Sequence, residues 1–269
     1  LLIIDMLEVV LIPDKKGSHC WQEGESIFGE FLERIILAEK MPSRVILTSQ
    51  YGLPVLAQGR YDQRLREVTL KGLTEEESLR LFERWKVSID NNETEDFLIR
   101  IIKIYEGHPL ALKLIAGDII NEPYQGDIEA FWEDNKPHFE AMEPLARNGE
   151  NVGSMYIIDE RIRSRVEDTL ERLFYSDYYA YLMLCMGSVL ERFAEKKAWL
   201  TILCDAPTNE QYLAFATLRK RFLLESEKPK RKVLYRLHNL IQNVALEHLD
   251  KIEEDEENSV GLLEVAKTE

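Results

Sequence analysis

The sequence is poor in cysteine and has no long apolar segment, and both absences exclude classes of protein. Its 269 residues contain three cysteines, which lie far apart and form no CxxC pair. This usage argues against a disulfide scaffold or a cysteine-rich zinc site, and it fits the reducing cytoplasm. Cys185 and Cys204 lie in apolar stretches, so we expect them to be small buried hydrophobes. No apolar run approaches the roughly 18 residues of a membrane span, so no membrane association is expected.

Positive charge is also scarce. The chain has 34 basic and 49 acidic residues, which gives a formal net charge of -15. Proteins that hold nucleic acid by its phosphates usually carry a basic domain, so a nucleic-acid partner is not expected for the chain as a whole. The exception is the stretch 219–236, which holds eight basic and two acidic side chains.

The first part of the chain alternates between strand and helix patterns. Residues 1–5 and 44–49 are short runs of successive apolar residues, which is typical of strands covered on both faces. Between them, apolar residues recur at helical spacing from Ser26 to Lys40, and 6–23 reads as a loop. A third strand is expected at 66–70. A strand, a helix and a strand in this order predict a βαβ unit, so this part is α/β.

The second part, residues 72–145, reads as a helical subdomain. Thr74 and Glu77 have the spacing of a capping box at a helix start. Gly107 ends a helix and Pro109 begins the next, because glycine adopts the left-handed turn and proline suits the first helical position. Further helices are expected at 95–105, 110–120 and 127–135, and 146–156 is the best linker candidate.

The third part, residues 157–249, reads as helices followed by a strand hairpin, which is typical of a winged helix. The hairpin strands are expected at 222–226 and 232–237, with a closing helix at 238–249. Residues 250–269 hold eight acidic and two basic side chains, so we interpret them as a solvated tail or the start of another unit.

Asp5 is the first candidate for chemistry. It follows an apolar strand, and open α/β sheets bind ligands at the carboxyl ends of their strands. An aspartate there can hold Mg²⁺ through water, and Glu8 could orient a water molecule. The alternative is that Asp5 caps a loop and that Glu8 is a surface charge.

Five segments in order carry a family resemblance. They are LLIIDMLE, SRVILTSQ, VTLKGLTEEESLRLF, GHPLAL and RLHNLIQNVALEHL. Together they resemble the NB-ARC type of STAND signalling NTPase, the AP-ATPase class, from residue 1 to about 249. The resemblance implies a mixed, mainly α fold. Residues 1–71 would be the C-terminal half of a P-loop-type α/β domain, followed by the helical and winged-helix subdomains.

The resemblance also implies roles for individual residues. Asp5 would be the Walker B aspartate that holds Mg²⁺, and Glu8 is the nearest further carboxylate for catalysis. Gln50 would be the sensor 1 residue. Pro109 would lie against the adenine, and His238 would reach the β-phosphate of ADP in the resting state.

This sequence departs from the family at several points. Met6 and Asn239 each stand where the family has an acid, and Gln50 stands where it often has arginine. None of the thirteen glycines is followed by lysine, so the P-loop pattern GxxxxGK[ST] is absent from these residues. In the family that motif precedes Walker B, which would place it before Leu1. We therefore expect a C-terminal part of a slow signalling ATPase, which alone binds neither ATP, ADP nor Mg²⁺ and is inactive.

Three functions remain open from the sequence. The resemblance implies a switch in which exchange of ADP for ATP leads to self-oligomerisation and activates a fused effector, with sensor repeats elsewhere in the parent protein. The basic stretch 219–236 leaves a DNA-binding winged-helix regulator as an alternative, although lysines on a wing can also serve only to protect an edge strand. The third possibility is an interaction module without a ligand.

Overall fold

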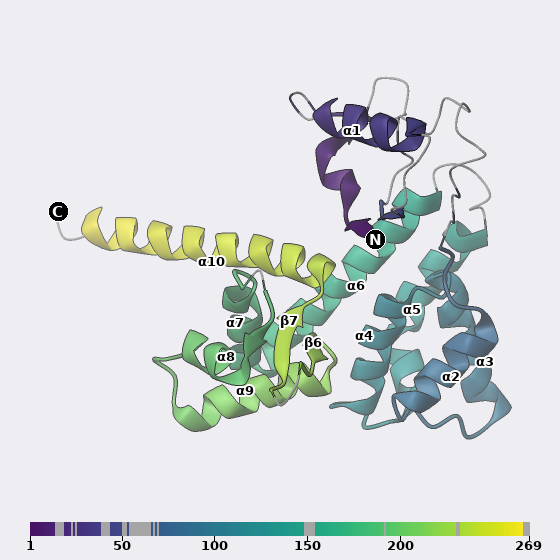
Figure 1. The fold of residues 1–269 in the computed structure, drawn as a ribbon. Coiled ribbons are helices and arrows are strands. Elements are labelled where there is room, and N and C mark those ends of the chain that lie inside the picture. Colours follow the sequence, from purple (N-terminus) through teal and green to yellow (C-terminus); the bar gives the residue numbers. More distant parts are fainter. Residues whose placement is uncertain are drawn as a thin grey trace. The chain divides into compact units, whose positions relative to one another are not determined.

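A computed structural model describes residues 1–13, 19–22, 24, 26–38, 44–49, 53, 66, 68, 70–147, 154–190, 192–229 and 232–265 (Figure 1). The chain divides into two units, Leu1–Leu70 and Lys71–Glu269, and each is described by itself. Helices account for 63% of the structure and strands for 10%, with small sheets. The expected mixed, mainly helical fold class is therefore confirmed.

The first unit contains the expected βαβ arrangement. Strand β1 (Leu2–Ile4) pairs in parallel with β4 (Val45–Leu47), and helix α1 (Ser26–Leu37) lies between them in the sequence. The third expected strand, 66–70, is described only at its first, middle and last residues, and these three lie outside any strand.

The β1–β4 pair is more exposed than the apolar runs predicted. Ile3 is 60% exposed and Ile46 is 49% exposed. The expectation of strands buried on both faces is therefore wrong for the described residues. The reason is that an apolar run predicts a strand but not what covers it, and within the described part of the chain this sheet has two strands.

The predicted loop at 6–23 holds regular structure. A 3-10 helix, η1 (Leu7–Val10), leads into an antiparallel hairpin of β2 (Leu11–Pro13) and β3 (His19–Trp21). Strands of three residues are too short to show alternation in the sequence, which explains the missed hairpin. Leu7 and Leu11 from these elements are buried in the small core of this unit.

The apolar spacing of helix α1 indicated that the face with Ile27 and Phe31 is buried, but a different face packs on that core. The buried residues are Gly29, Leu32 and Ile36, whereas Ile27 is 67% exposed and Phe31 is 42% exposed. The two apolar stripes are neighbours on the helix, so spacing alone could not decide which one is buried.

Four helices open the second unit. They are α2 (Glu75–Arg84), α3 (Asn92–Ile104), α4 (Pro109–Ile120) and α5 (Ile128–Arg147). The capping box of Thr74 and Glu77 is confirmed, because each side chain bonds the backbone N–H of the other residue. Pro109 is confirmed as the first residue of α4. Helix α5 is much longer than the expected 127–135.

Two glycines bring the starts of α2 and α4 together. The N–H of Leu73 donates to the carbonyl oxygen of Gly107 at 3.0 Å. A Cβ atom on Gly107 would lie 2.0 Å from the Leu73 oxygen, and one on Gly72 would lie 1.8 Å from the Glu106 oxygen. Gly107 also has φ +68, so the absence of a side chain is required for both space and conformation.

The remaining elements of the second unit are helices and short strands. They are α6 (Ser154–Ser176), α7 (Tyr178–Gly187), β5 (Ala194–Glu195), α8 (Lys196–Ile202), α9 (Thr208–Lys220), β6 (Leu224–Glu227), β7 (Leu234–Leu237) and α10 (Asn239–Val265). The antiparallel sheet has the order β5-β7-β6, so the expected hairpin is confirmed. Strand β5 was missed because it has two residues, and α10 continues past the expected end at residue 249 (Figure 1).

One cluster of buried apolar side chains runs through the whole second unit. Trp132 and Trp199 are buried in it and Trp85 packs against it. Cys185 is buried, but Cys204 is exposed, so the expectation for the second cysteine is wrong. Cys204 lies in the turn after α8, where its side chain points out of the core. Among the described residues, none of the helices combines the length and apolarity needed to span a membrane.

Candidate functional site

In the first unit, Asp5 lies at the carboxyl end of β1. Its Oδ1 atom accepts a hydrogen bond from the hydroxyl of Thr48, which directly follows β4. The N–H of Met6 donates to the same hydroxyl oxygen at 3.0 Å, and the N–H of Leu7 donates to the Thr48 carbonyl at 3.0 Å. Thr48 was not among the predicted site residues, although a hydroxyl residue directly after the second parallel strand is a usable signal. The ends of both strands are thus bound to each other beside one carboxylate.

This arrangement suits a hydrated cation better than a fully enclosed one. Asp5 is exposed, and no group of three possible metal-ligating side chains occurs among the described residues. Mg²⁺ keeps several waters and often takes only one or two carboxylates from the protein. Asp5 and the Thr48 hydroxyl therefore fit a magnesium ion held through water. Glu8 lies in η1 with its side chain outside the described atoms, and Gln50 lies outside the described residues.

In the second unit, His238 lies close enough to His108, the histidine of the GHPLAL segment, to affect its pKa. His108 directly precedes α4, and His238 directly precedes α10. Burial lowers the pKa of His108, and the positive charge of His238 lowers it further. Its neighbours Gly107 and Pro109 predict an exposed side chain without a role, but His108 is half-buried and its Nδ1 atom is buried without a hydrogen-bond partner. A histidine between glycine and proline carries no burial signal, which explains the error.

His238 is held in one orientation by the start of its helix. Its Nδ1 atom lies 3.3 Å from the backbone nitrogen of Leu240, which donates to it. In the neutral ring this leaves the proton on Nε2, so Nε2 is the donor that can face a ligand. Burial lowers the pKa of His238, while the nearby carboxylate of Glu225 acts in the opposite direction.

Lys113 completes this group of basic side chains. It lies on α4, one turn after Pro109, and burial lowers its pKa while Glu225 opposes the change. Pro109 itself is exposed. Glu225 is also bound by Arg236, with the guanidinium Nε donating at 2.8 Å. We call His108, Lys113 and His238 the basic cluster. All three are half-buried, Glu225 acts on Lys113 and His238, and a phosphate would stabilise the protonated forms of all three.

The basic cluster predicts a particular pH dependence. Because the pKa values of His108 and His238 are lower in the folded protein, the unfolded chain binds their protons more tightly. Their contribution to stability is therefore complete above the unfolded histidine pKa of about 6.5 and is lost as the pH falls below it. We expect urea unfolding to show a smaller loss between pH 7.5 and 5.5 for the double variant His108→Gln, His238→Gln than for the unmodified protein. Equal losses would contradict this account.

Several basic side chains of the stretch 219–236 already have partners. Arg236 binds Glu225, Lys232 binds Glu195, and Arg221 is buried against Asp118. Residues 230 and 231 lie outside the described part of the chain. The phosphate-binding capacity of this stretch is thus smaller than its composition indicated.

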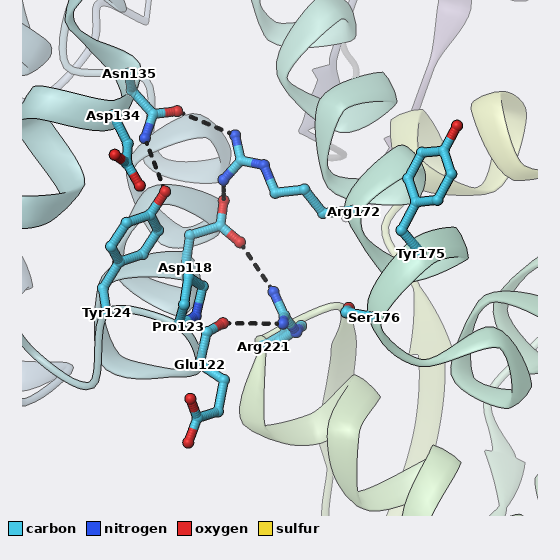
Figure 2. Close-up of a pocket in the computed structure, with 10 residues that line it drawn as sticks. All are labelled: Asp118, Glu122, Pro123, Tyr124, Asp134, Asn135, Arg172, Tyr175, Ser176 and Arg221. Atoms are coloured by element: carbon cyan, nitrogen blue, oxygen red, sulfur yellow. Dashed lines mark hydrogen bonds and ion pairs between the residues drawn. The ribbon is translucent and has the colours of Figure 1, made fainter.

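A second polar site was missed completely by the sequence analysis. Asp118 of α4 is 2% exposed and binds three arginines from two other segments (Figure 2). Arg165 and Arg172 of α6 bind its Oδ2 atom, the latter at 3.0 Å, and Arg221 after α9 binds Oδ1 at 3.2 Å. We call these four residues the Asp118 cluster. A single aspartate within an apolar helix was the only signal in the sequence.

The comparison with known proteins gave little that identifies the chain. No protein-family model matches it. An uncharacterized WD repeat-containing protein of Nostoc sp. is 26% identical over 230 residues, which is 84% of this chain. The chain spans 16% of the length of that protein. The similarity thus covers most of this chain and a small part of a much longer relative.

Proposed function

We propose that this chain is part of an NB-ARC-type ATP/ADP switch, covering the Walker B strand, the helical subdomain and the winged helix. The observation that carries the proposal is that His108, next to Pro109, and His238 are both half-buried and that His238 lies close enough to lower the pKa of His108. These residues come from the two segments assigned to adenine and β-phosphate, and they lie 130 positions apart in the sequence. A nucleotide that touches both would hold the helical and winged-helix parts together.

The chemistry of the basic cluster supports the same proposal. Without a ligand, burial favours the neutral forms of both histidines and of Lys113. A phosphate next to them would favour the charged forms and would be bound by charge-assisted hydrogen bonds. In the first unit, taken by itself, Asp5 and Thr48 would hold Mg²⁺ through water, as the family resemblance implies for Asp5. In the switch, ADP would then favour the closed state and ATP an oligomeric, active state.

The WD repeats named for the Nostoc sp. relative fit this architecture. We propose that the sensor repeats of the parent protein are of the WD type, that an effector is fused to the switch, and that the protein acts in the cytoplasm. Hydrolysis, if the parent performs it, would be slow, with Asp5 and Glu8 as the carboxylates. The chain by itself would not hydrolyse ATP, because its residues lack the P-loop pattern.

The role of His238 is tested on the native protein that contains this chain. Replacing His238 by alanine should speed ADP release about tenfold, because one charge-assisted hydrogen bond to phosphate is lost. Release is followed by exchange of a fluorescent ADP analogue against excess unlabelled ADP. The oligomeric state is measured in parallel by light scattering, and we expect the variant to oligomerise at lower ATP concentration.

The matched control for this experiment is His138→Ala. His138 lies on α5 with a side chain that is 40% exposed and faces Asp168, outside the basic cluster. It should leave ADP release unchanged. Equal release rates for the His238 variant and the unmodified protein would contradict the proposed switch. If the native protein binds no nucleotide but binds duplex DNA in a salt-dependent way, the DNA-binding regulator is correct instead.

A further inference from the structure

The charges buried in the Asp118 cluster do not balance. One carboxylate, 2% exposed, is bound by three guanidinium groups, and Arg165 is fully buried. The Nε and Nη1 atoms of Arg165 have no hydrogen-bond partner and are shielded from solvent. Burial and the charge of Arg165 lower the pKa of Arg172, as expected where positive charge is in excess. Asp168, which is 31% exposed, acts on Arg172 in the opposite direction, and Glu122 and Asp134 beside the cluster are exposed.

A cavity of about 430 Å³ opens beside this excess charge. Figure 2 shows its lining, in which Arg172 and Arg221 meet the two oxygens of Asp118 and Tyr175 and Ser176 lie on α6. The other lining residues come from the turn after α4 and from α5: Glu122, Pro123, Tyr124, Asp134 and Asn135. The volume falls in the range of small-molecule sites and exceeds what a bare ion needs.

We propose that this cavity binds a small ligand through an oxyanion group, either phosphate or carboxylate, held by Arg172 and Arg221. Arginine presents its donors in a planar fork that matches such groups. The hydroxyl of Ser176 and the rings of Tyr124 and Tyr175 line the rest of the space and suit the body of a small organic ligand. This site is separate from the basic cluster and does not depend on the proposed nucleotide switch.

The position of the cavity gives the ligand a structural consequence. Asp118 belongs to α4, whereas Arg172 belongs to α6 and Arg221 to the turn after α9. An oxyanion that bridges the two arginines would add bonds between these segments and would stabilise their packing by mass action. Binding of the ligand can therefore be measured in two ways, as a rise in the thermal unfolding midpoint and as the heat released in a calorimetric titration.

The test uses the chain with inorganic phosphate and, separately, acetate at constant ionic strength maintained with sodium chloride. At a concentration about ten times the dissociation constant, we expect the unfolding midpoint to rise by about 3 to 5 °C. Calorimetric titration should show saturable binding in the millimolar range or tighter. The anion that binds more tightly identifies the group, phosphate or carboxylate, that the site prefers.

Two variants test whether Arg172 is responsible for binding the anion. Arg172→Gln should weaken binding about tenfold or more, because it removes a charged donor while keeping an amide for Asp118 and Asn135. Arg163→Gln is the matched control, because Arg163 lies on the same helix and has a side chain 33% exposed, close to the 30% of Arg172. Absence of saturable binding to the unmodified protein would overturn the proposal. An equal midpoint shift in both variants would also overturn it, since that is a general salt effect.

Discussion

Replacing Asp118 by asparagine should lower the free energy of unfolding by about 4 kcal/mol, although the shape of the side chain is kept. The substitution removes the one buried carboxylate that Arg165, Arg172 and Arg221 share. Buried guanidinium groups then face one another without an opposite charge, and removal of one partner of a buried ion pair is strongly destabilising. Urea unfolding followed by tryptophan fluorescence measures the change.

The control for this prediction is Asp96→Asn. Asp96 is an exposed aspartate on α3, so the same chemical change there should alter stability by less than about 0.5 kcal/mol. A second variant separates charge from packing. Adding Arg165→Met to Asp118→Asn should recover part of the lost stability, because the most deeply buried positive charge is removed together with its partner. If the double variant is less stable than Asp118→Asn, the electrostatic account is wrong.

Replacing Gly107 by alanine should lower the free energy of unfolding by about 3 kcal/mol. A Cβ atom at this position would lie 2.0 Å from the Leu73 carbonyl oxygen, so the backbone segments must separate and their hydrogen bond is strained. Overpacking of this kind costs about 1–3 kcal/mol, and a side chain in the left-handed region adds about 1 kcal/mol. Thermal or urea unfolding provides the measurement.

Gly126→Ala gives a control that isolates the conformational part of this cost. Gly126 has φ +99, yet a Cβ atom there would meet no other atom within 4 Å. Its substitution should therefore cost only about 1 kcal/mol, from backbone conformation alone. Equal losses for the two glycines would mean that the close approach of Leu73 to Gly107 does not contribute.

Local signals in the sequence were sufficient for most of the helices of the second unit. The Thr74–Glu77 capping box, the Gly107 stop and the Pro109 start each depend on residues within one turn of each other. Because these signals are local, the predicted end of α5 at residue 135 was wrong. A proline such as Pro137 normally interrupts a helix, but Phe139 and Met142 beyond it are buried in the core of the second unit, and that packing extends the helix.

The features that were missed depend on contacts between distant segments. Arg165 and Arg172 of α6 approach Asp118 only because α4 and α6 pack together, and no local pattern records that pairing. His108 was judged by its neighbours in the sequence, whereas its burial is set by the surrounding fold. The sequence named Asp5, Pro109 and His238 as candidates, whose roles stay predictions; the structure adds Thr48 beside Asp5 in the first unit, and His108 and Lys113 in the second. Gln50 and the side chain of Glu8 stay predictions, since both lie outside what the structure describes.

Helix α10 connects His238 to a distant point of the molecule. The helix begins directly after this histidine and runs for 27 residues, which corresponds to about 40 Å at 1.5 Å per residue. A rigid rod of that length tilted by about 10° at its first turn moves its other end by about 7 Å. A small change in the direction of α10 at the His238 end thus corresponds to a displacement of several ångströms at its far end, near Val265.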